Sequence, residues 1–336
     1  MKNYETLKKI LRCDKINLTY FREVFRMKNE NPEKKFSHVV VIGVDGAGAF
    51  IKNAETPEFD RIFKDGAVTY EALSSRPSIS AECWGSMLLG VGPEVHKLTN
   101  GILENTTYPI DSEFPSLFRR IKEKYPEAEL GSFCDWNPIT HGIVENNLGV
   151  KHDTADDTTL TPIVCDYIRQ NKPTFLFVHF DSVDGRGHKF GYGTQPYMLR
   201  ISEVDKLIND IHKALKDTQM IDDTLFIVIA DHGGTNPVTG GGSHGGWTDE
   251  EKYVTFAAAG KGVNKTYIKE MNIRDLSAIV LYAFGIETPD FDENGWTSQI
   301  PQGLFDDENI KPYRDISHLT GASPRISKIP HTSELI

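Results

Sequence analysis

The sequence predicts an α/β protein, a three-layer sandwich in which helices cover both faces of a mainly parallel sheet. Five short apolar runs have the composition of buried strands, at residues 37–44, 128–133, 174–180, 224–230 and 253–259. Helical periodicity lies between them and is clearest where apolar residues recur every three or four positions from Met198 to Leu215. Continuous apolar strands that alternate with amphipathic helices are typical of a parallel sheet buried on both faces.

Composition excludes several classes of protein. The chain has 336 residues, 39% of them hydrophobic, which is enough for a large core and argues against disorder or a small disulfide scaffold. With 37 basic and 48 acidic side chains the net charge is −11, so we expect no nucleic-acid polymer as a partner. No apolar run approaches the roughly 20 residues that span a bilayer, and the first residues contain no apolar signal-peptide core. The four scattered cysteines fit reduced thiols, and we therefore expect a cytoplasmic protein without membrane contact.

Three regions follow from charge and periodicity along the chain. Residues 1–36 carry ten basic against five acidic side chains and are predicted to form an N-terminal helical appendage and linker, a candidate surface for oligomer formation. Residues 37–300 form the predicted catalytic domain. Residues 301–336 are expected to be a partly irregular C-terminal extension, because their last stretch is polar and interrupted by proline.

Carboxylates and imidazoles follow the predicted strands. Asp45 follows the first apolar run, Asp184 and His188 follow the third, Asp231 and His232 follow the fourth, and His244 lies in a glycine-rich loop before the fifth. In open α/β sheets, ligands bind beyond the carboxyl ends of the strands, so we expect these six side chains to converge there. Such a set without thiolates suits Zn²⁺ or Mn²⁺, and six ligands exceed the four of one tetrahedral ion. Two divalent ions are predicted, Zn²⁺ first and Mn²⁺ as the alternative.

Ser80 is the predicted nucleophile. It precedes the helical run AECWGSMLLG and occupies the position of an N-cap, where the helix dipole and free backbone N–H groups favour an alkoxide and a bound phosphate. Simple helix capping is the alternative role for this serine, and Ser78 is the nearest alternative nucleophile.

The chain resembles the alkaline-phosphatase superfamily and, within it, the type I phosphodiesterase/nucleotide pyrophosphatase branch. The resemblance covers roughly residues 37 to 300 in segments that include VVVIGVDGAGAF, PSISAECWGSMLLGVGPEVHKLTN, VDGRGHKFG, IADHGG and GGSHGGWTDEE. It implies an alkaline-phosphatase-like fold in which Asp184, His188 and His244 hold one ion, while Asp45, Asp231, His232 and Ser80 hold the other. It also implies that Asn100 helps to bind a phosphate oxygen.

The resemblance leaves the substrate open. Nucleotide pyrophosphatases usually have a threonine nucleophile where this chain has Ser80, and a glycine commonly follows the histidine where this chain reads His96-Lys97. The sulfatase motif is absent after Ser80 and Cys83, so sulfatase activity is not expected.

The expected activity is two-metal hydrolysis of phosphate esters through a covalent phosphoserine-type intermediate at Ser80. Two ions and three aspartates leave a net charge near +1, which falls to about zero when Ser80 ionises and so suits a singly charged diester. We therefore favour phosphodiesters or nucleotide pyrophosphate bonds of small molecules. A phosphomonoesterase or phosphomutase is the alternative, and Arg186, between two predicted ligands, is the candidate extra cation for binding substrate.

Overall fold

The computed structural model describes residues 34–316. Residues 1–33 of the predicted N-terminal appendage and residues 317–336 of the predicted C-terminal extension lie outside the described residues.

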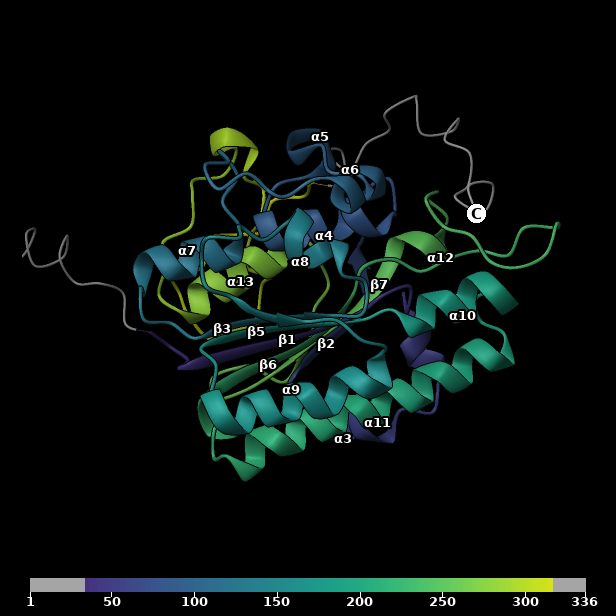
Figure 1. The fold of residues 1–336 in the computed structure, drawn as a ribbon, viewed down its shortest axis with the longest axis horizontal. Coiled ribbons are helices and arrows are strands. Elements are labelled where there is room, and N and C mark those ends of the chain that lie inside the picture. Colours follow the sequence, from purple (N-terminus) through teal and green to yellow (C-terminus); the bar gives the residue numbers. More distant parts are fainter. Residues whose placement is uncertain (1–33, 317–336) are drawn as a thin grey trace, which may run out of the picture.

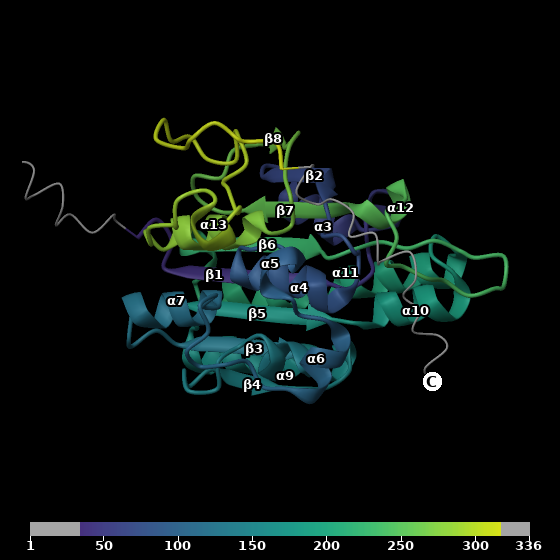
Figure 2. The same ribbon diagram turned by 90° about the horizontal axis from the view of Figure 1, so that it is seen from above.

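The centre of the fold is an eight-stranded sheet in the order β4-β3-β5-β1-β6-β7-β2-β8 (Figure 2). The strands are β1 (His38–Val44), β2 (Ala67–Leu73), β3 (Leu130–Cys134), β4 (Lys151–Asp153), β5 (Phe175–Phe180), β6 (Thr224–Ala230), β7 (Tyr253–Ala259) and β8 (Thr266–Tyr267). β7 is antiparallel to both neighbours, and the other pairs are parallel. The mainly parallel sheet and the five predicted strands are confirmed, whereas β2, β4 and β8 were not predicted.

Helices cover both faces of the sheet, which confirms the three-layer architecture (Figure 1). On one face lie α3 (Pro57–Phe63), α9 (Asp157–Asn171) and α11 (Gln195–Asp217); on the other lie α4 (Ser80–Leu89), α7 (Leu117–Lys124), α8 (Pro138–Gly142) and α13 (Asp275–Ala283). The remaining helices are α5 (Pro93–His96), α6 (Asn100–Asn105), α10 (Ser182–Phe190) and α12 (Asp249–Lys252), with short 3₁₀ turns at Phe50–Asn53, Ile221–Asp223 and Glu293–Gly295. The predicted helix between Met198 and Leu215 is part of α11, which starts earlier because Pro196 fits the first turn of a helix.

The register of the three central strands positions the site. Val44 at the end of β1 lies opposite Phe180 of β5 and Ala230 of β6, and these strands are almost wholly buried. The residues that follow all three strands therefore emerge at one level of one sheet edge. β7 runs the other way, so the loop that precedes it arrives at this same edge.

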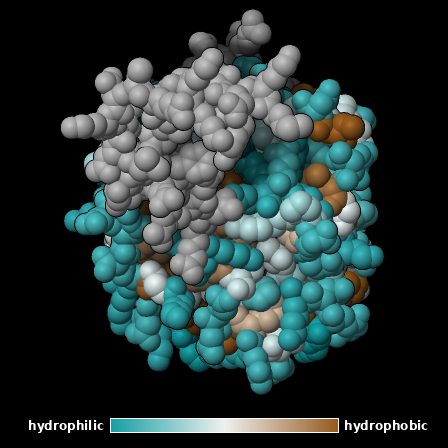
Figure 3. Space-filling view, turned by 90° about the vertical axis from the view of Figure 1, so that its left-hand side faces the viewer, coloured by the Kyte–Doolittle hydropathy of each residue, from teal (hydrophilic) through white to brown (hydrophobic). Residues whose placement is uncertain are grey.

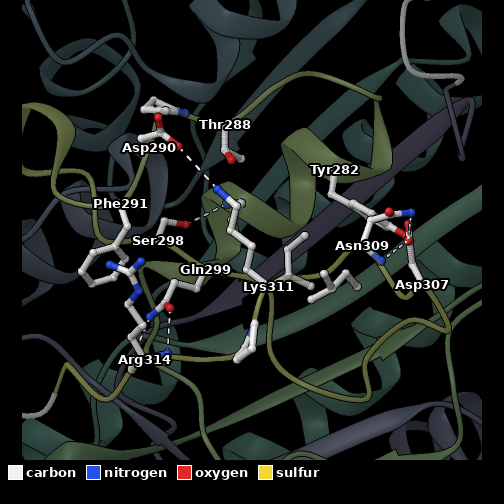
Figure 4. A pocket seen from close by; sticks show the side chains of 15 residues that line it. Tyr282, Thr288, Asp290, Phe291, Ser298, Gln299, Asp307, Asn309, Lys311 and Arg314 are labelled. Carbon is white, nitrogen blue, oxygen red and sulfur yellow. Dashed lines mark hydrogen bonds and ion pairs between the residues drawn. The ribbon is translucent and has the colours of Figure 1, made fainter. Parts of the chain in front are cut away.

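Residues 301–316 pack on α13 and form no helix and no strand of the sheet. A pocket of about 430 Å³ lies between them and this helix (Figure 4). Its polar groups bind one another: Lys311 pairs with Asp290 at 3.4 Å, and Asp307 accepts a hydrogen bond of 2.7 Å from Tyr282. The division into three regions, with a C-terminal extension at 301–336, stays a prediction from the sequence.

The opposite end of the molecule, toward the amino ends of the parallel strands, is shown in Figure 3. Its described and visible surface is largely hydrophilic, and apolar residues are scattered over it. Within residues 34–316, no helix combines the length and apolar character that a membrane span requires.

Candidate active site

The carboxylate of Asp45 has one oxygen bound by the protein and one turned toward the predicted cluster. Its Oδ2 atom accepts hydrogen bonds from Trp84 Nε1 at 2.9 Å and from His179 Nε2 at 3.0 Å. Its Oδ1 atom lies 3.5 Å from Ser80 Oγ and 3.4 Å from His232 Nε2. Asp45 is thus oriented to offer a single oxygen beside the predicted nucleophile.

Asp231 repeats this arrangement. Its Oδ1 atom accepts from the backbone N–H groups of Gly46 at 3.0 Å and His232 at 2.8 Å. Its Oδ2 atom is buried without a hydrogen-bond partner among the described residues and lies 3.3 Å from His232 Nε2. An unpartnered buried carboxylate oxygen is costly, so a cation at this position would remove a penalty that the fold otherwise retains.

Asp184 shows the same division between its two oxygens. Tyr192 donates to Oδ1 from its hydroxyl group, while Oδ2 lies 3.0 Å from His188 Nε2 and 4.0 Å from His244 Nε2. Gly46 makes this position accessible, because its φ is +66° and a Cβ atom there would lie 2.4 Å from Asp184 Oδ1.

All three predicted histidine ligands are held in one tautomer. Their Nδ1 atoms contact backbone carbonyl oxygens: His188 that of Gly242 at 3.1 Å, His232 that of Gly233 at 2.9 Å, and His244 that of Ser78 at 2.8 Å. Because a carbonyl can only accept, Nδ1 carries the proton in each ring and Nε2 is left to face the cluster. This is the arrangement in which histidine binds a metal, with its other nitrogen fixed by a hydrogen bond.

The distances between these free atoms fit two metal-binding sets. In the first set, His188 Nε2 lies 3.0 Å from Asp184 Oδ2 and 3.2 Å from His244 Nε2. In the second set, Ser80 Oγ lies 3.2 Å from His232 Nε2 and 3.5 Å from Asp45 Oδ1. His232 Nε2 also lies 3.4 Å from Asp45 Oδ1 and 3.3 Å from Asp231 Oδ2. Ligands about 2.0–2.1 Å from a tetrahedral ion are separated by about 3.3 Å, so the residues present fit two divalent ions.

The buried charges of the cluster shift the pKa values of its members in different directions. Burial, and then the nearby charges of Asp45 and Asp184, raise the pKa of Asp231 well above its usual value. The hydrogen bond to Asp184 raises the pKa of His188 to about 9, so a proton competes with an ion for this nitrogen. Burial, followed by the charge of His232, lowers the pKa of His244 to about 4 and keeps its lone pair free.

Ser80 is the first residue of α4 and does not cap it. Ile79 is the N-cap residue, and no side chain caps this helix end. The hydroxyl group of Ser80 instead lies 3.2 Å from His232 Nε2 and faces Asp45. The capping alternative is therefore wrong, and the serine side chain is directed into the cluster.

The alternative nucleophile, Ser78, binds the backbone of a neighbouring loop. Its side chain is fully buried, donates to the Gly246 carbonyl at 3.0 Å and accepts from the Gly245 N–H at 3.0 Å. These bonds, with the contact between its own carbonyl and His244, fix the loop that carries that histidine.

Asn100 lies beside the start of α4. Its Oδ1 atom accepts a hydrogen bond of 3.0 Å from the backbone N–H of Ala81, the residue after Ser80. The amide oxygen is thereby fixed, and its NH₂ group is the remaining donor of this side chain. From the sequence, the backbone N–H groups at this helix start were expected to be free to bind a phosphate oxygen. The N–H group of Ala81 instead donates to Asn100.

Arg186 does not join the cluster. Its side chain is exposed, and the guanidinium lies 5.6 Å from the centre of the Phe190 ring. Arg186 lies two positions from both Asp184 and His188 in α10, which places it on a different side of the helix. Within residues 34–316, no ion pair or hydrogen bond links it to the three aspartates.

Sequence reasoning missed Trp84, His179 and Tyr192, which bind the cluster carboxylates from behind. A signal existed for one of them: His179 is a polar residue inside the otherwise apolar run FLFVHF, and the structure buries it completely.

Comparison with known proteins places the chain among phosphodiesterase-like folds. Residues 124–241 match the model of the type I phosphodiesterase/nucleotide pyrophosphatase family. Murine ectonucleotide pyrophosphatase/phosphodiesterase 5, solved in complex with AMP, superposes with a TM-score of 0.63 at 14% identity, over 76% of this chain and 97% of that one. A 2-O glycosaminoglycan sulfatase, BT1596, superposes with a TM-score of 0.62 at 16% identity, over 79% of this chain and 73% of the other. At these identities the likeness concerns the fold.

Among curated sequences, the chain is similar to two fungal enzymes. It is 22% identical to GPI ethanolamine phosphate transferase 2 of Aspergillus fumigatus over 222 residues, 63% of this chain and 28% of that protein. It is 33% identical to GPI ethanolamine phosphate transferase 1 of Chaetomium globosum over 100 residues, 30% of this chain and 10% of that protein. The chain thus matches less than a third of the length of each.

Proposed function

Because this chain belongs to the alkaline-phosphatase superfamily, in its type I phosphodiesterase/nucleotide pyrophosphatase branch, we propose that it cleaves phosphate esters of small molecules with two divalent ions and Ser80 as the nucleophile. The proposal rests on one feature that the six predicted ligands share. Each aspartate has one oxygen, and each histidine one nitrogen, held by the protein, and the other atom faces the cluster. Zn²⁺ is the proposed ion, with Mn²⁺ as the alternative, because the donors are nitrogen and oxygen only.

The residues of the chain supply four functions in this reaction. Ser80 Oγ attacks phosphorus in line and forms a phosphoserine-type ester while the first product leaves. Asp45, Asp231 and His232 surround the attacking oxygen, and Asp184, His188 and His244 surround the leaving side. The NH₂ group of Asn100 donates to a non-bridging phosphate oxygen. When bound, the ions supply Lewis-acid stabilisation of the oxygens that enter and leave phosphorus.

A phosphodiester or nucleotide pyrophosphate bond is the proposed target. Four basic residues lie close in sequence to the predicted ligands or the nucleophile: Arg76, Lys97, Arg186 and Lys189. Three of these side chains lie over aromatic rings, Arg76 over Trp247 and both Arg186 and Lys189 over Phe190. Within residues 34–316, no lysine or arginine forms an ion pair with the three aspartates, so these residues offer no evident partner for the second negative charge of a monoester. A phosphomonoesterase or phosphomutase stays the alternative from the sequence.

A transferase is a second candidate, favoured by the similarity to the two ethanolamine phosphate transferases. Hydrolysis and transfer share the covalent ester on Ser80 and differ in the acceptor, which is water in one case and a hydroxyl group in the other. Action in the cytoplasm on a soluble substrate remains a proposal from the sequence.

The test is kcat/KM for bis-p-nitrophenyl phosphate, the p-nitrophenyl ester of TMP and p-nitrophenyl phosphate, each with Zn²⁺ and with Mn²⁺. We expect the diesters to be preferred, and a tenfold preference for the monoester, about 1.4 kcal/mol, would overturn the diesterase assignment. The p-nitrophenyl ester of phosphoethanolamine separates the acceptors: free phosphoethanolamine indicates hydrolysis, and a new ester with an added alcohol indicates transfer. A mutase would release no net phosphate.

Ser80→Ala should abolish turnover while both ions remain bound, because the hydroxyl is a reactant and only one of seven ligands. Ser202→Ala, on α11 and outside the cluster, is the matched control. Retention of more than about a tenth of the wild-type kcat would exclude Ser80 as the nucleophile.

A further inference from the structure

Among the described residues, four histidines surround the three aspartates, and one differs from the other three. His188, His232 and His244 each bind a carbonyl through Nδ1 and face the cluster through Nε2. In His179 the Nδ1 atom is buried without a hydrogen-bond partner among the described residues, and Nε2 contacts Asp45 at 3.0 Å. A neutral ring in this contact carries its proton on Nε2, so His179 acts as a donor to the carboxylate.

Trp84 Nε1 also donates to Asp45 Oδ2, from helix α4 rather than from strand β5. It lies on α4 one turn after Ser80, so the helix that presents the nucleophile also binds Asp45. The indole and the His179 ring meet edge to face, with centroids 5.0 Å apart at 84°. Gly43 leaves room for this contact, because a Cβ atom there would lie 2.4 Å from the indole ring.

The two donors decide which oxygen of Asp45 can reach an ion. With two N–H groups on Oδ2, that oxygen is turned away from the cluster, and Oδ1 alone faces Ser80 and His232. Without these donors the carboxylate can rotate about its Cβ–Cγ bond or offer both oxygens at once. The ion beside the nucleophile would then lose its fixed ligand.

We propose that Trp84 and His179 are positioning residues that hold Asp45 as a one-oxygen ligand for the ion at Ser80. This inference rests on the two-ion centre of the proposed function. It assigns the two residues to one ion only: the site of Asp184, His188 and His244 receives no contact from either side chain among the hydrogen bonds of the described chain.

The experiment is a calorimetric titration of the full chain, stripped of metal by a chelator, with Mn²⁺. In a His244→Ala background the remaining ion is the one at Asp45, and in an Asp231→Ala background it is the one at Asp184. Adding Trp84→Phe to the first should weaken Mn²⁺ binding 10- to 100-fold, the range seen when the hydrogen-bond partner of a metal ligand is removed. Adding it to the second should change binding less than threefold. Trp296→Phe, another buried indole outside this cluster, is the matched control and should leave both affinities unchanged.

His179 supplies a second, independent comparison that separates donation from packing. His179→Gln keeps an N–H group at the end of the side chain and should retain Mn²⁺ affinity within about threefold, whereas His179→Leu should lose affinity as Trp84→Phe does. Equal weakening of both ions, or no weakening of the ion at Asp45, would refute the inference while leaving the two-ion centre intact.

Two further outcomes are informative. Asp181 also lies near Asp45 and His179, with ligand atoms within 4.8 Å of one another, so a third Mn²⁺ that disappears in His179→Leu would make His179 a ligand and overturn its role as a donor. A wild-type protein that binds neither Mn²⁺ nor Zn²⁺ would instead remove the proposed metal centre itself, and the positioning role with it.

Discussion

Acidification should destabilise the fold through His96, which lies at the end of α5 and packs against α4. Its Nδ1 atom accepts a hydrogen bond of 3.0 Å from the Leu98 N–H, and its Nε2 atom lies 3.2 Å from Ser86 Oγ and 3.3 Å from the Glu82 carbonyl. The ring is therefore held neutral, with its proton on Nε2. Burial lowers the pKa of His96 from 6.5 to about 3.

The magnitude follows from linkage between protonation and folding. Because the unfolded chain binds this proton near pH 6.5 and the folded chain only near pH 3, the contribution of His96 is complete above pH 6.5 and is lost progressively as the pH falls toward 3. At pH 5 the loss is about 2 kcal/mol, from 1.36 kcal/mol for each of roughly 1.5 pH units.

The assay compares urea unfolding of the wild type with that of His96→Asn at pH 7 and pH 5, in chelator so that metal binding does not contribute. The Oδ1 atom of asparagine can take the place of Nδ1 and accept from Leu98, and the variant has no group that titrates in this range. The wild type should lose about 2 kcal/mol more than His96→Asn between the two pH values, whereas replacing the exposed His152 by asparagine should not alter the wild-type loss. Equal losses in the wild type and His96→Asn would refute the reasoning.

Three further outcomes are expected. Saturating metal at about 100 times Kd should stabilise the protein by about 2.7 kcal/mol per ion, and His244→Ala and Asp231→Ala should each lose a different ion; a wild-type melting temperature that chelation leaves unchanged would contradict this. Ser78→Ala should destabilise the fold by about 1–3 kcal/mol in urea unfolding, because it removes the hydrogen bonds to the Gly245 N–H and the Gly246 carbonyl in the His244 loop, and an unchanged midpoint would argue against that role. Lys97→Gly should raise the unfolding free energy by about 1 kcal/mol, since Lys97 has a φ of 58°, which glycine adopts without strain; a decrease would refute this reading of the turn.

The strands that the sequence predicted are those buried on both faces, whose composition is continuous and apolar. Three strands were not predicted. β4 consists of three exposed polar residues, KHD, and β8 has only two residues. β2 has no continuous apolar run, because burial alternates along it. The antiparallel direction of β7 was also not predicted. An apolar run carries no sign of its direction, which depends on the connection that delivers it to the sheet.

The convergence of the six cluster residues was predictable because strand ends bring them together, and the structure places oxygen and nitrogen atoms of these side chains 3.0–4.0 Å from one another. Their role as metal ligands stays a prediction. Their supporting contacts were not predictable, because a tryptophan in an apolar helix and a histidine in an apolar strand have the appearance of core residues. Asn100 shows the same limit: sequence placed it near the nucleophile, but only the structure shows that it occupies the Ala81 N–H.

The loop between β6 and β7 offers a place where the chain can be lengthened without disturbing the cluster. Two backbone hydrogen bonds of 2.8 Å between Thr235 and Ser243 close its base, so His244 and the Asp231-His232 pair lie on the strand side of this closure. Beyond it, Val238 is fully exposed. A peptide tag or a small domain inserted at this tip would stand beside the catalytic edge while both ends of the loop remain fixed, which makes the tip a point from which substrate range can be varied by engineering.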